Sequence, residues 1–472
     1  MRIPTIGLEI HAELSTKTKM FCRCLNDFRE KHPNQNVCPV CLAHPGNLPV
    51  VNIAAVEAVV KAGLALGGEI AKHSHFDRKS YFYPDLPKAY QISQYEEPLV
   101  TGGRLDGIRI RRIHLEEDTG RLLHELPDYK KADASFVDYN RAGVPLMELV
   151  TEPDIKNAEE AVKFASDLQL IFRYLGISDA DMEKGQMRVE ANISLDMGTK
   201  VEVKNINSFK AVHDAIEYEL KRQEKALEEG HKIIQETRGW DDKKGVTLSQ
   251  RSKESAHDYR YFPEPDLPPL DLKEWDLEKI KAEIPELPEA KTRRFVQEFG
   301  LPQEQVWTLV SDKARADYFE EAVSELKALS SKADPQILFN YFLSDLMGIM
   351  KEKKADLGDL KIAPEHFAHL VAMIQEGKLS SRLAKDLLLK MFETGEDPET
   401  LMNQSGLKLM SDEFELRGVI KGIIEKNPKP VADYKKGKAT ALQFLIGQAM
   451  AGTKGQADPG KLREMFEKEL EV

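Results

Sequence analysis

The chain has 472 residues, of which 41% are hydrophobic and 31% are charged, and its formal net charge is −12. This length suits two to four domains. The acidic balance argues against a surface coated with basic residues for nucleic acid, although it is compatible with a local basic patch. No apolar run approaches the roughly 20 residues that span a bilayer, and Met1–Pro4 leads into a strand pattern without the apolar segment of a secretory signal. We therefore expect a soluble, cytoplasmic protein.

Short strands and occasional helices alternate over the first 290 or so residues. Apolar and polar residues alternate over Ile6–Glu13, which predicts a strand, and similar patterns follow at 188–193 and 201–204. Between the first of these strands and the other two, a helix is expected to begin after Asn157, in a capping box, and to end at Gly176. Because the strands show no regular βαβ rhythm, the pattern favours the α+β class.

A proline-rich stretch at 263–288 interrupts the strands, because prolines at this density exclude a regular element. Beyond it the patterns are helical, for example the apolar stripe over 383–391, and a second break falls near 403–406. These breaks predict three domains, with boundaries at 1–292, 293–405 and 406–472.

The only four cysteines lie close together near the N-terminus, as Cys22, Cys24, Cys38 and Cys41. Two close pairs joined by a loop suit one tetrahedral metal ion, and a reducing cytosol disfavours disulfides. We predict a structural Zn²⁺ site with four thiolates, which has no open position for a substrate. The alternative is four unrelated buried cysteines.

A strand rich in acidic residues precedes the cysteines. Glu9, His11 and Glu13 share one face because side chains alternate along a strand; for this segment alone, a solvent-facing polar edge is the alternative. Further acidic residues lie in other predicted strands, at Glu116, Glu117, Glu148 and Glu190. A carboxylate in an apolar strand is costly to bury unless it is paired or bound to metal. Several carboxylates with one imidazole suit Mg²⁺, which prefers oxygen ligands and usually bridges to phosphate.

No Walker A motif and no G-x-G-x-x-G fingerprint is present in the sequence. Phosphates would therefore need other contacts, and the candidates are Lys79, Lys88, Arg188 and Lys204. Each of them alone is also compatible with an ordinary surface cation. Two loops rich in aromatic residues and proline, at 81–91 and 258–266, are compatible either with lining a polar pocket or with packing.

Taken together and in this order, several stretches closely resemble the B/E family of subunits of tRNA-dependent amidotransferases. The matching stretches are 7–11, 81–94, 115–118, 140–146, 151–154, 204–205 and 258–263. The resemblance spans essentially the whole chain, with the C-terminal part matching by layout more than by motif. It implies a largely antiparallel β cradle domain that carries the catalysis, an all-helical domain and a small helical tail domain that contacts tRNA.

The activity implied by the resemblance is the ATP-dependent amidation of Glu-tRNA(Gln) or Asp-tRNA(Asn). The side-chain carboxylate would be phosphorylated with the help of Mg²⁺, and ammonia from a glutaminase A subunit would then displace the phosphate, with a small C subunit completing a heterotrimer. A carboxylate nucleophile is already ionised at neutral pH, so catalysis reduces to positioning and charge neutralisation. This requirement agrees with a chain rich in acidic residues and without a nucleophilic triad.

The resemblance also implies roles for individual residues. Catalysis and Mg²⁺ binding fall to Glu9, His11, Glu117, Glu148 and Glu190. Alternation alone leaves Glu116 and Glu117 open, since they face opposite ways, and the family match favours Glu117. The candidates for tRNA contact are Lys426, Lys429, Lys435, Lys436 and Lys438, for which a solvated loop is the alternative. Two other functions are compatible with the same residues, a metal-dependent phosphohydrolase and a non-catalytic tRNA-binding scaffold.

Overall fold

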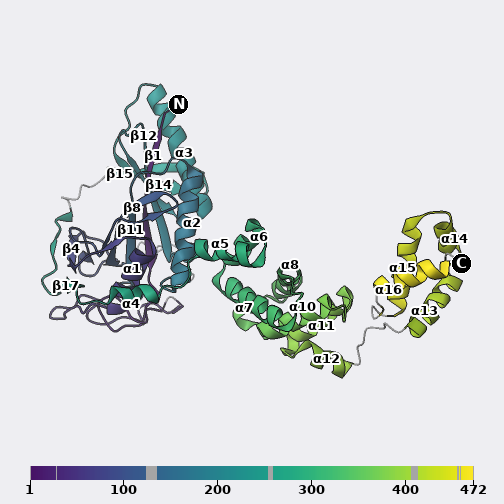
Figure 1. Ribbon diagram of the computed structural model, residues 1–472. Helices are drawn as coiled ribbons and strands as arrows, with labels where there is room; N and C mark the ends of the chain where they lie inside the picture. The colour runs from purple at the N-terminus through teal and green to yellow at the C-terminus, as the bar shows by residue number, and fades with distance from the viewer. Residues whose placement is uncertain are drawn as a thin grey trace. The chain divides into compact units, whose positions relative to one another are not determined.

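The structure is a computed structural model that divides into two compact units, Met1–Pro288 and Glu289–Val472 (Figure 1). The residues it describes are 2–27, 29–123, 135–252, 259–405, 413–453, 457 and 459–470. All strands among the described residues belong to the first unit, and the second unit is helical. The predicted α+β class with a helical C-terminal part is therefore confirmed. The division into three domains stays a prediction; its second break, expected near 403–406, falls where a helix ends at Ser405, and residues 406–412 lie outside the described residues.

The first unit is built on a mixed sheet of ten described strands. Its order is β15-β14-β13-β12-β1-β11-β8-β6-β2, with β7 paired to β8. Among the described pairs only β13–β14 is parallel. The strands are β1 (Pro4–Glu13), β2 (Glu69–Ile70), β6 (Val100–Thr101), β7 (Arg104–Leu105), β8 (Ile108–Glu117), β11 (Pro145–Thr151), β12 (Met187–Leu195), β13 (Val201–Ile206), β14 (Glu236–Asp241) and β15 (Val246–Ser252).

Short strands form three small sheets beside the large one. They are β4 (Asp77–Ser80) with β5 (Tyr90–Ser93) and β16 (Phe262–Pro263), β9 (Arg121–Leu123) with β10 (Phe136–Asp138), and β3 (His73–Ser74) with β17 (Leu270–Asp271). The two aromatic loops expected from the sequence flank the first of these sheets, because β16 pairs with β4. Asp258, the first residue of the second loop, lies outside the described residues.

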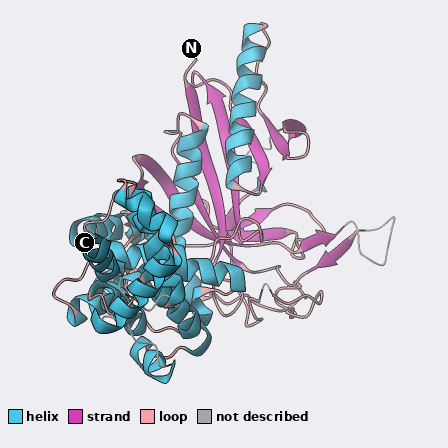
Figure 2. Cartoon of the chain, turned by 90° about the vertical axis from the view of Figure 1, so that its right-hand side faces the viewer, coloured by secondary structure: helices cyan, strands magenta, loops and turns pink. Residues whose placement is uncertain are grey.

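Helices cover one face of the large sheet (Figures 1 and 2). They are α1 (Ile53–Ala65), α2 (Ala158–Leu175) and α3 (Phe209–Glu228), and the short helix α4 (Leu277–Ala282) packs against α1. Leu8 and Ile10 of β1 are almost fully buried in one core with Phe164 of α2. The apolar half of the β1 alternation therefore faces the helices, and its polar half faces the other way.

Local sequence sets the ends of α2 as predicted. The side chain of Asn157 accepts a hydrogen bond from the backbone N–H of Glu160 at 2.8 Å. The Glu160 carboxylate in turn accepts from the backbone N–H of Lys156 and from the Asn157 amide, both at 2.9 Å. At the other end Gly176 adopts a left-handed conformation with φ of 67°, which glycine reaches without steric cost.

The second unit consists of helices throughout its described residues. They are α5 (Pro288–Phe299), α6 (Gln303–Val310), α7 (Lys313–Leu329), α8 (Pro335–Asn340), a π-helix η2 (Tyr341–Leu346), α9 (Met347–Lys353), a 3₁₀ turn η3 (Leu357–Asp359), α10 (Pro364–Gln375), α11 (Ser381–Thr394), α12 (Pro398–Ser405), α13 (Glu413–Lys426), α14 (Pro428–Lys435), α15 (Ala439–Gly452) and α16 (Pro459–Leu470). Helices α13, α15 and α16 share a small core that includes Leu416 and Phe466. Within the described residues, no helix combines the length and the apolar character that crossing a membrane requires.

Candidate active site

Polar side chains from four neighbouring strands meet on the face of the sheet opposite the helices. In the antiparallel register, His11 of β1 lies opposite Glu148 of β11 and Arg188 of β12. Glu148 in turn lies opposite His114 of β8. Residues directly opposite each other in antiparallel strands point to the same face. The sheet therefore carries a continuous polar row of Arg188, His11, Glu148 and His114.

His11, Glu116 and Glu148 form the first cluster on this face, and their ligand atoms all lie within 4.8 Å of one another. The Nε2 atom of His11 is 3.3 Å from a Glu148 oxygen and 3.7 Å from a Glu116 oxygen. Burial disfavours a charged imidazole, but Glu148, Glu190 and Glu116 outweigh burial and raise the pKa of His11 to about 9. Two buried carboxylates beside one imidazole are a donor set that fits Mg²⁺.

Glu9, Glu190 and Glu202 form a second acidic cluster, again with ligand atoms within 4.8 Å. Burial and the charges of Glu148 and Glu190 raise the pKa of Glu9. Its carboxylate accepts a hydrogen bond from Asn192 at 3.0 Å. Of the five residues expected at one site, His11 and Glu148 thus lie in the first cluster and Glu9 and Glu190 in the second. The fifth, Glu117, lies in neither cluster.

One lysine and one hydroxyl group bind two carboxylates of the second cluster. Lys204 donates to Glu190 at 2.6 Å, and Thr237 donates to Glu202 at 2.7 Å. Sequence reasoning missed Glu202. The signal was present in its strand, since Glu202 and Lys204 are two residues apart and so share a face.

Glu117 lies apart from the first cluster. It is opposite Pro145, whereas Glu116 is opposite Leu146, which pairs with Glu13 of the polar face. The Glu117 carboxylate forms an ion pair with Lys88 at 2.6 Å and accepts a hydrogen bond from the backbone of Ile92 at 3.0 Å. The structure therefore groups Glu116 with His11 and Glu148, and the metal-binding role that the family match favoured for Glu117 stays a prediction.

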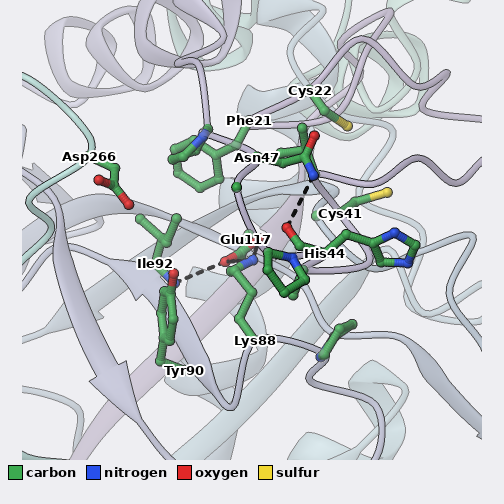
Figure 3. A pocket seen from close by; sticks show the side chains of 17 residues that line it. Phe21, Cys22, Cys41, His44, Asn47, Lys88, Tyr90, Ile92, Glu117 and Asp266 are labelled. Carbon is green, nitrogen blue, oxygen red and sulfur yellow. Dashed lines mark hydrogen bonds and ion pairs between the residues drawn. The ribbon is translucent and has the colours of Figure 1, made fainter.

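A cavity of about 260 Å³ lies between the cysteine loop and Glu117 (Figure 3). Its lining includes Cys41 and His44 from the loop, and Lys88, Tyr90 and Glu117 from the other side. Figure 3 shows Lys88 and Tyr90 beside Glu117. The two neighbouring glutamates of β8 thus lie in different surroundings. Glu116 belongs to the acidic cluster, and Glu117 lines this cavity.

The other candidate phosphate contacts also lie close to acidic groups. Arg188 donates to Asp118 at 2.6 Å. Burial would raise the pKa of Asp118, but Arg188 and Arg141 bring it down to about 2. Burial disfavours a charge on Lys79, yet Glu116, Tyr261 and Glu148 raise its pKa well above the ordinary value. Each predicted cation therefore lies where it balances acidic groups.

Aromatic rings from the two loops surround Lys79. Its Nζ atom lies 5.2 Å from the centre of the Tyr259 ring and 5.9 Å from that of Tyr81. Tyr261 packs edge-on against Tyr259 and stacks on Tyr95 at 4.4 Å between ring centres. Cation–π contacts of this kind stabilise a partly desolvated lysine. The loops thus pack against each other and also line the surroundings of a candidate phosphate contact.

The four cysteine Sγ atoms lie within 4.8 Å of one another, and these cysteines, all in described segments, form no disulfide. The fully buried Lys19 places its Nζ atom 3.7 Å from the Cys41 Sγ. A hydrogen bond from Cys22, together with the Lys19 charge, lowers the pKa of the Cys41 thiol. Four thiols in this geometry, one of them beside a cation that favours the thiolate, fit a tetrahedral metal such as Zn²⁺. Sequence reasoning gave no signal for Lys19.

The five lysines suggested for tRNA contact lie at the end of α13, in α14 and in the turn before α15, and all of them are exposed. Lys438 forms an ion pair with Asp433 at 3.2 Å. The structure thus clusters them around one short helix.

The face opposite the helices thus carries two groups of carboxylates on a largely antiparallel sheet, and carboxylate oxygens are the ligands that hard cations prefer. Residues 4–278 match the family model described as the GatB/GatE catalytic domain, and residues 317–470 match the one described as the GatB domain. The chain belongs to the GatB/GatE family, as the resemblance in the sequence predicted.

Relatives match the chain almost from end to end. A protein from Caldanaerobacter subterraneus subsp. tengcongensis is 46% identical over 479 residues, which cover 98% of each chain. One from Thermotoga maritima is 46% identical over 482 residues, and one from Persephonella marina is 45% identical over 481, each covering 99% of both chains. All three are named as the B subunit of an aspartyl/glutamyl-tRNA(Asn/Gln) amidotransferase.

Proposed function

We propose that the chain is the activating subunit of a tRNA-dependent amidotransferase, acting on Glu-tRNA(Gln), Asp-tRNA(Asn) or both. The observation that carries the proposal is the cluster of His11, Glu116 and Glu148 beside Lys79, in a chain of the GatB/GatE family. The relatives' names supply the substrate class. The cluster supplies a place for a hard cation, which an activation by phosphoryl transfer needs.

The reaction has two balanced steps. An oxygen of the substrate carboxylate attacks the γ-phosphorus of ATP, which forms an acyl phosphate and releases ADP. Ammonia then attacks the acyl carbon, so that a C–N bond forms and the C–O bond to phosphate breaks, and the proton lost by the nitrogen leaves with the phosphate as HPO4²⁻. No general base is required in the first step, because the carboxylate is ionised at neutral pH.

His11, Glu116 and Glu148 would hold the metal, and Mg²⁺, when bound there, neutralises charge on the transferring phosphoryl group. Lys79 would contact phosphate oxygens from the side of the aromatic loops. Glu9, Glu190 and Glu202 add negative potential next to this cluster, and Lys204 and Arg188 offset part of it. The chain's own contribution is thus positioning and charge balance.

The remaining features receive structural or binding roles in the proposal. Zn²⁺ held by the four cysteines would brace the segment that follows β1. The exposed lysines around α14 would contact tRNA phosphates. The partners would be an amidase A subunit that supplies ammonia and a small C subunit, in the cytoplasm.

The test is amidation of purified Glu-tRNA(Gln) and Asp-tRNA(Asn) with ATP and ammonium chloride, by the chain reconstituted with the A and C subunits. We expect transfer of ³²P from γ-labelled ATP to the aminoacyl-tRNA, followed by amide formation. Glu148→Gln should lower amidation by about a hundredfold or more without loss of tRNA affinity. Glu152→Gln, on an exposed ion pair with Arg111, is the matched control and should stay near wild type.

Other outcomes would favour the alternatives. Phosphate release that needs no aminoacyl-tRNA would indicate a phosphohydrolase. Full amidation by Glu148→Gln would indicate a scaffold whose catalytic site lies in another subunit. Either result overturns the proposal.

A further inference from the structure

His114 is a buried histidine in the polar row, and the proposed chemistry gives it no role. It lies in β8 directly opposite Glu148 and two residues before Glu116, so all three side chains share one face of the sheet. Only 2% of its surface is exposed. An imidazole at this depth beside two carboxylates requires a physical explanation.

The two nitrogens of His114 have different surroundings. Its Nε2 atom is 3.5 Å from Glu148 Oε2 and 4.0 Å from Glu116 Oε2. Its Nδ1 atom is buried and has no hydrogen-bond partner among the described residues. A proton on Nε2 faces two acceptors, whereas a proton on Nδ1 would face none. The neutral tautomer that satisfies the site therefore carries its proton on Nε2.

His11 and His114 approach the two carboxylates from different strands. Both Nε2 atoms face Glu148 Oε2, at 3.3 and 3.5 Å. Glu116 has its two oxygens on different partners, since Oε1 lies 3.7 Å from His11 while Oε2 accepts a hydrogen bond from Ser93 at 3.1 Å and faces His114. Ser93 thus holds one oxygen of Glu116 through a hydrogen bond, His114 lies near the same oxygen, and the other oxygen lies toward His11.

We propose that His114 is a positioning residue: its Nε2–H holds the Glu148 and Glu116 carboxylates in the orientation that binds the cation together with His11. The proposal rests on the proposed function, because it assigns the cation to that cluster. Groups behind metal ligands commonly set ligand orientation, and losing one typically weakens metal affinity by about 10- to 100-fold. His114 itself is outside the set of ligand atoms within 4.8 Å, which contains His11, Glu116 and Glu148.

Three substitutions separate this role from simple packing. The side-chain amide nitrogen of glutamine reaches the position of a histidine Nε2, and that of asparagine reaches the position of Nδ1. Phenylalanine fills the volume of the ring without a donor. His114→Gln therefore keeps the proposed donor, whereas His114→Asn and His114→Phe remove it. His369→Gln, at a histidine that pairs with Asp397 in the helical unit, is the matched control.

The experiment measures Mn²⁺, as a probe for Mg²⁺, bound to the full-length chain purified with zinc. Electron paramagnetic resonance gives the affinity, and electron spin echo modulation detects ¹⁴N of a bound imidazole. We expect His114→Gln and His369→Gln to bind within about twofold of wild type, and His114→Asn and His114→Phe to bind about tenfold more weakly. At saturation the ¹⁴N signal should persist in all four variants and disappear in His11→Ala.

Several results would overturn the proposal. If His114→Phe binds Mn²⁺ as tightly as wild type, the ring of His114 contributes packing only. If His114→Asn and His114→Gln have the same Mn²⁺ affinity, the position of the hydrogen-bond donor does not matter. If the ¹⁴N signal of His114→Gln is halved, His114 is a ligand. If neither donor-lacking variant folds while Gln does, the donor serves the fold and not the cation. If the ¹⁴N signal of bound Mn²⁺ is the same in His11→Ala as in wild type, the cation does not bind at this cluster, and the proposed function is contradicted. That result is distinct from those that contradict only the role of His114.

Discussion

Glu116 and Glu117 are consecutive residues of β8 whose carboxylates serve opposite sides of the sheet. Glu116 joins His11 and Glu148, while Glu117 forms its ion pair with Lys88 at 2.6 Å and borders the cavity beside the cysteine loop. The two side chains are chemically identical and nearly equally buried. Strand register alone therefore assigns them to different environments.

This separation predicts different effects of the same substitution. Glu116→Gln removes one charge from the cation cluster and should weaken Mn²⁺ binding about tenfold or more. Glu117→Gln should keep the Mn²⁺ affinity within about twofold of wild type, because Glu117 forms its ion pair with Lys88 on the opposite face of the sheet. Titration of both full-length variants by electron paramagnetic resonance checks this, and a larger loss for Glu117→Gln would contradict it.

The sequence predicts which side chains of one strand share a face, because apolar and polar residues alternate along it. It does not predict which residues of neighbouring strands lie opposite each other. The pattern over Ile6–Glu13 correctly separated the core face of β1 from its polar face. The choice of Glu116 required knowing that it pairs with Leu146 and, through it, with Glu13. Such pairing depends on loops and bulges, for example the register shift between Val189 and Ala191 that sets how β13 brings Glu202 to the cluster.

Zinc removal should destabilise the first unit. The cysteine cluster predicts about one zinc per chain, bound by residues that hold the segment after β1. Cys38→Ser should lose the metal and lower the melting temperature, because metal-binding energy contributes directly to folding. Mass-spectrometric metal analysis and calorimetry measure both quantities. In wild type, chelation should have the same effect, reversed by zinc but not by magnesium; zinc-free protein of unchanged melting temperature would rule this out.

The capping box of α2 should contribute measurably to stability. Asn157→Ala leaves the Glu160 N–H without its side-chain acceptor, and we expect a loss of about 0.5–2 kcal/mol in the free energy of unfolding. Asn157→Ser keeps an acceptor at the cap without placing a second carboxylate beside Glu160, and it should stay near wild type. Urea unfolding followed by circular dichroism compares them, and equal losses for the two variants would be inconsistent with a capping role.

Asp154 should make stability depend on pH in the acid range. Hydrogen bonds from Arg109 at 2.9 and 2.8 Å lower the pKa of Asp154 to about 2, from about 3.9 in an unfolded chain. A carboxylate with a lowered folded-state pKa stabilises the fold above its unfolded pKa, and that contribution is lost as the pH falls through the folded value. The urea midpoint of Asp154→Asn should therefore lie below wild type at pH 7, and the two should converge near pH 2. A constant difference at all pH values would show that the effect is not electrostatic.

The lysines around α14 should contribute to tRNA binding through charge alone. Phosphate contacts release counterions, so each one adds to the salt dependence of affinity without reading sequence. Lys435→Ala combined with Lys436→Ala should weaken tRNA binding and reduce the slope of log affinity against log salt by about two. The double variant Lys353→Ala, Lys354→Ala removes two exposed charges from the end of α9 and is the matched control. Filter binding over a salt series measures both, and equal effects of the two pairs would mean that net charge, and not this surface, attracts the tRNA. If the α14 pair instead leaves both affinity and slope unchanged, these lysines form the solvated surface that the sequence also allowed.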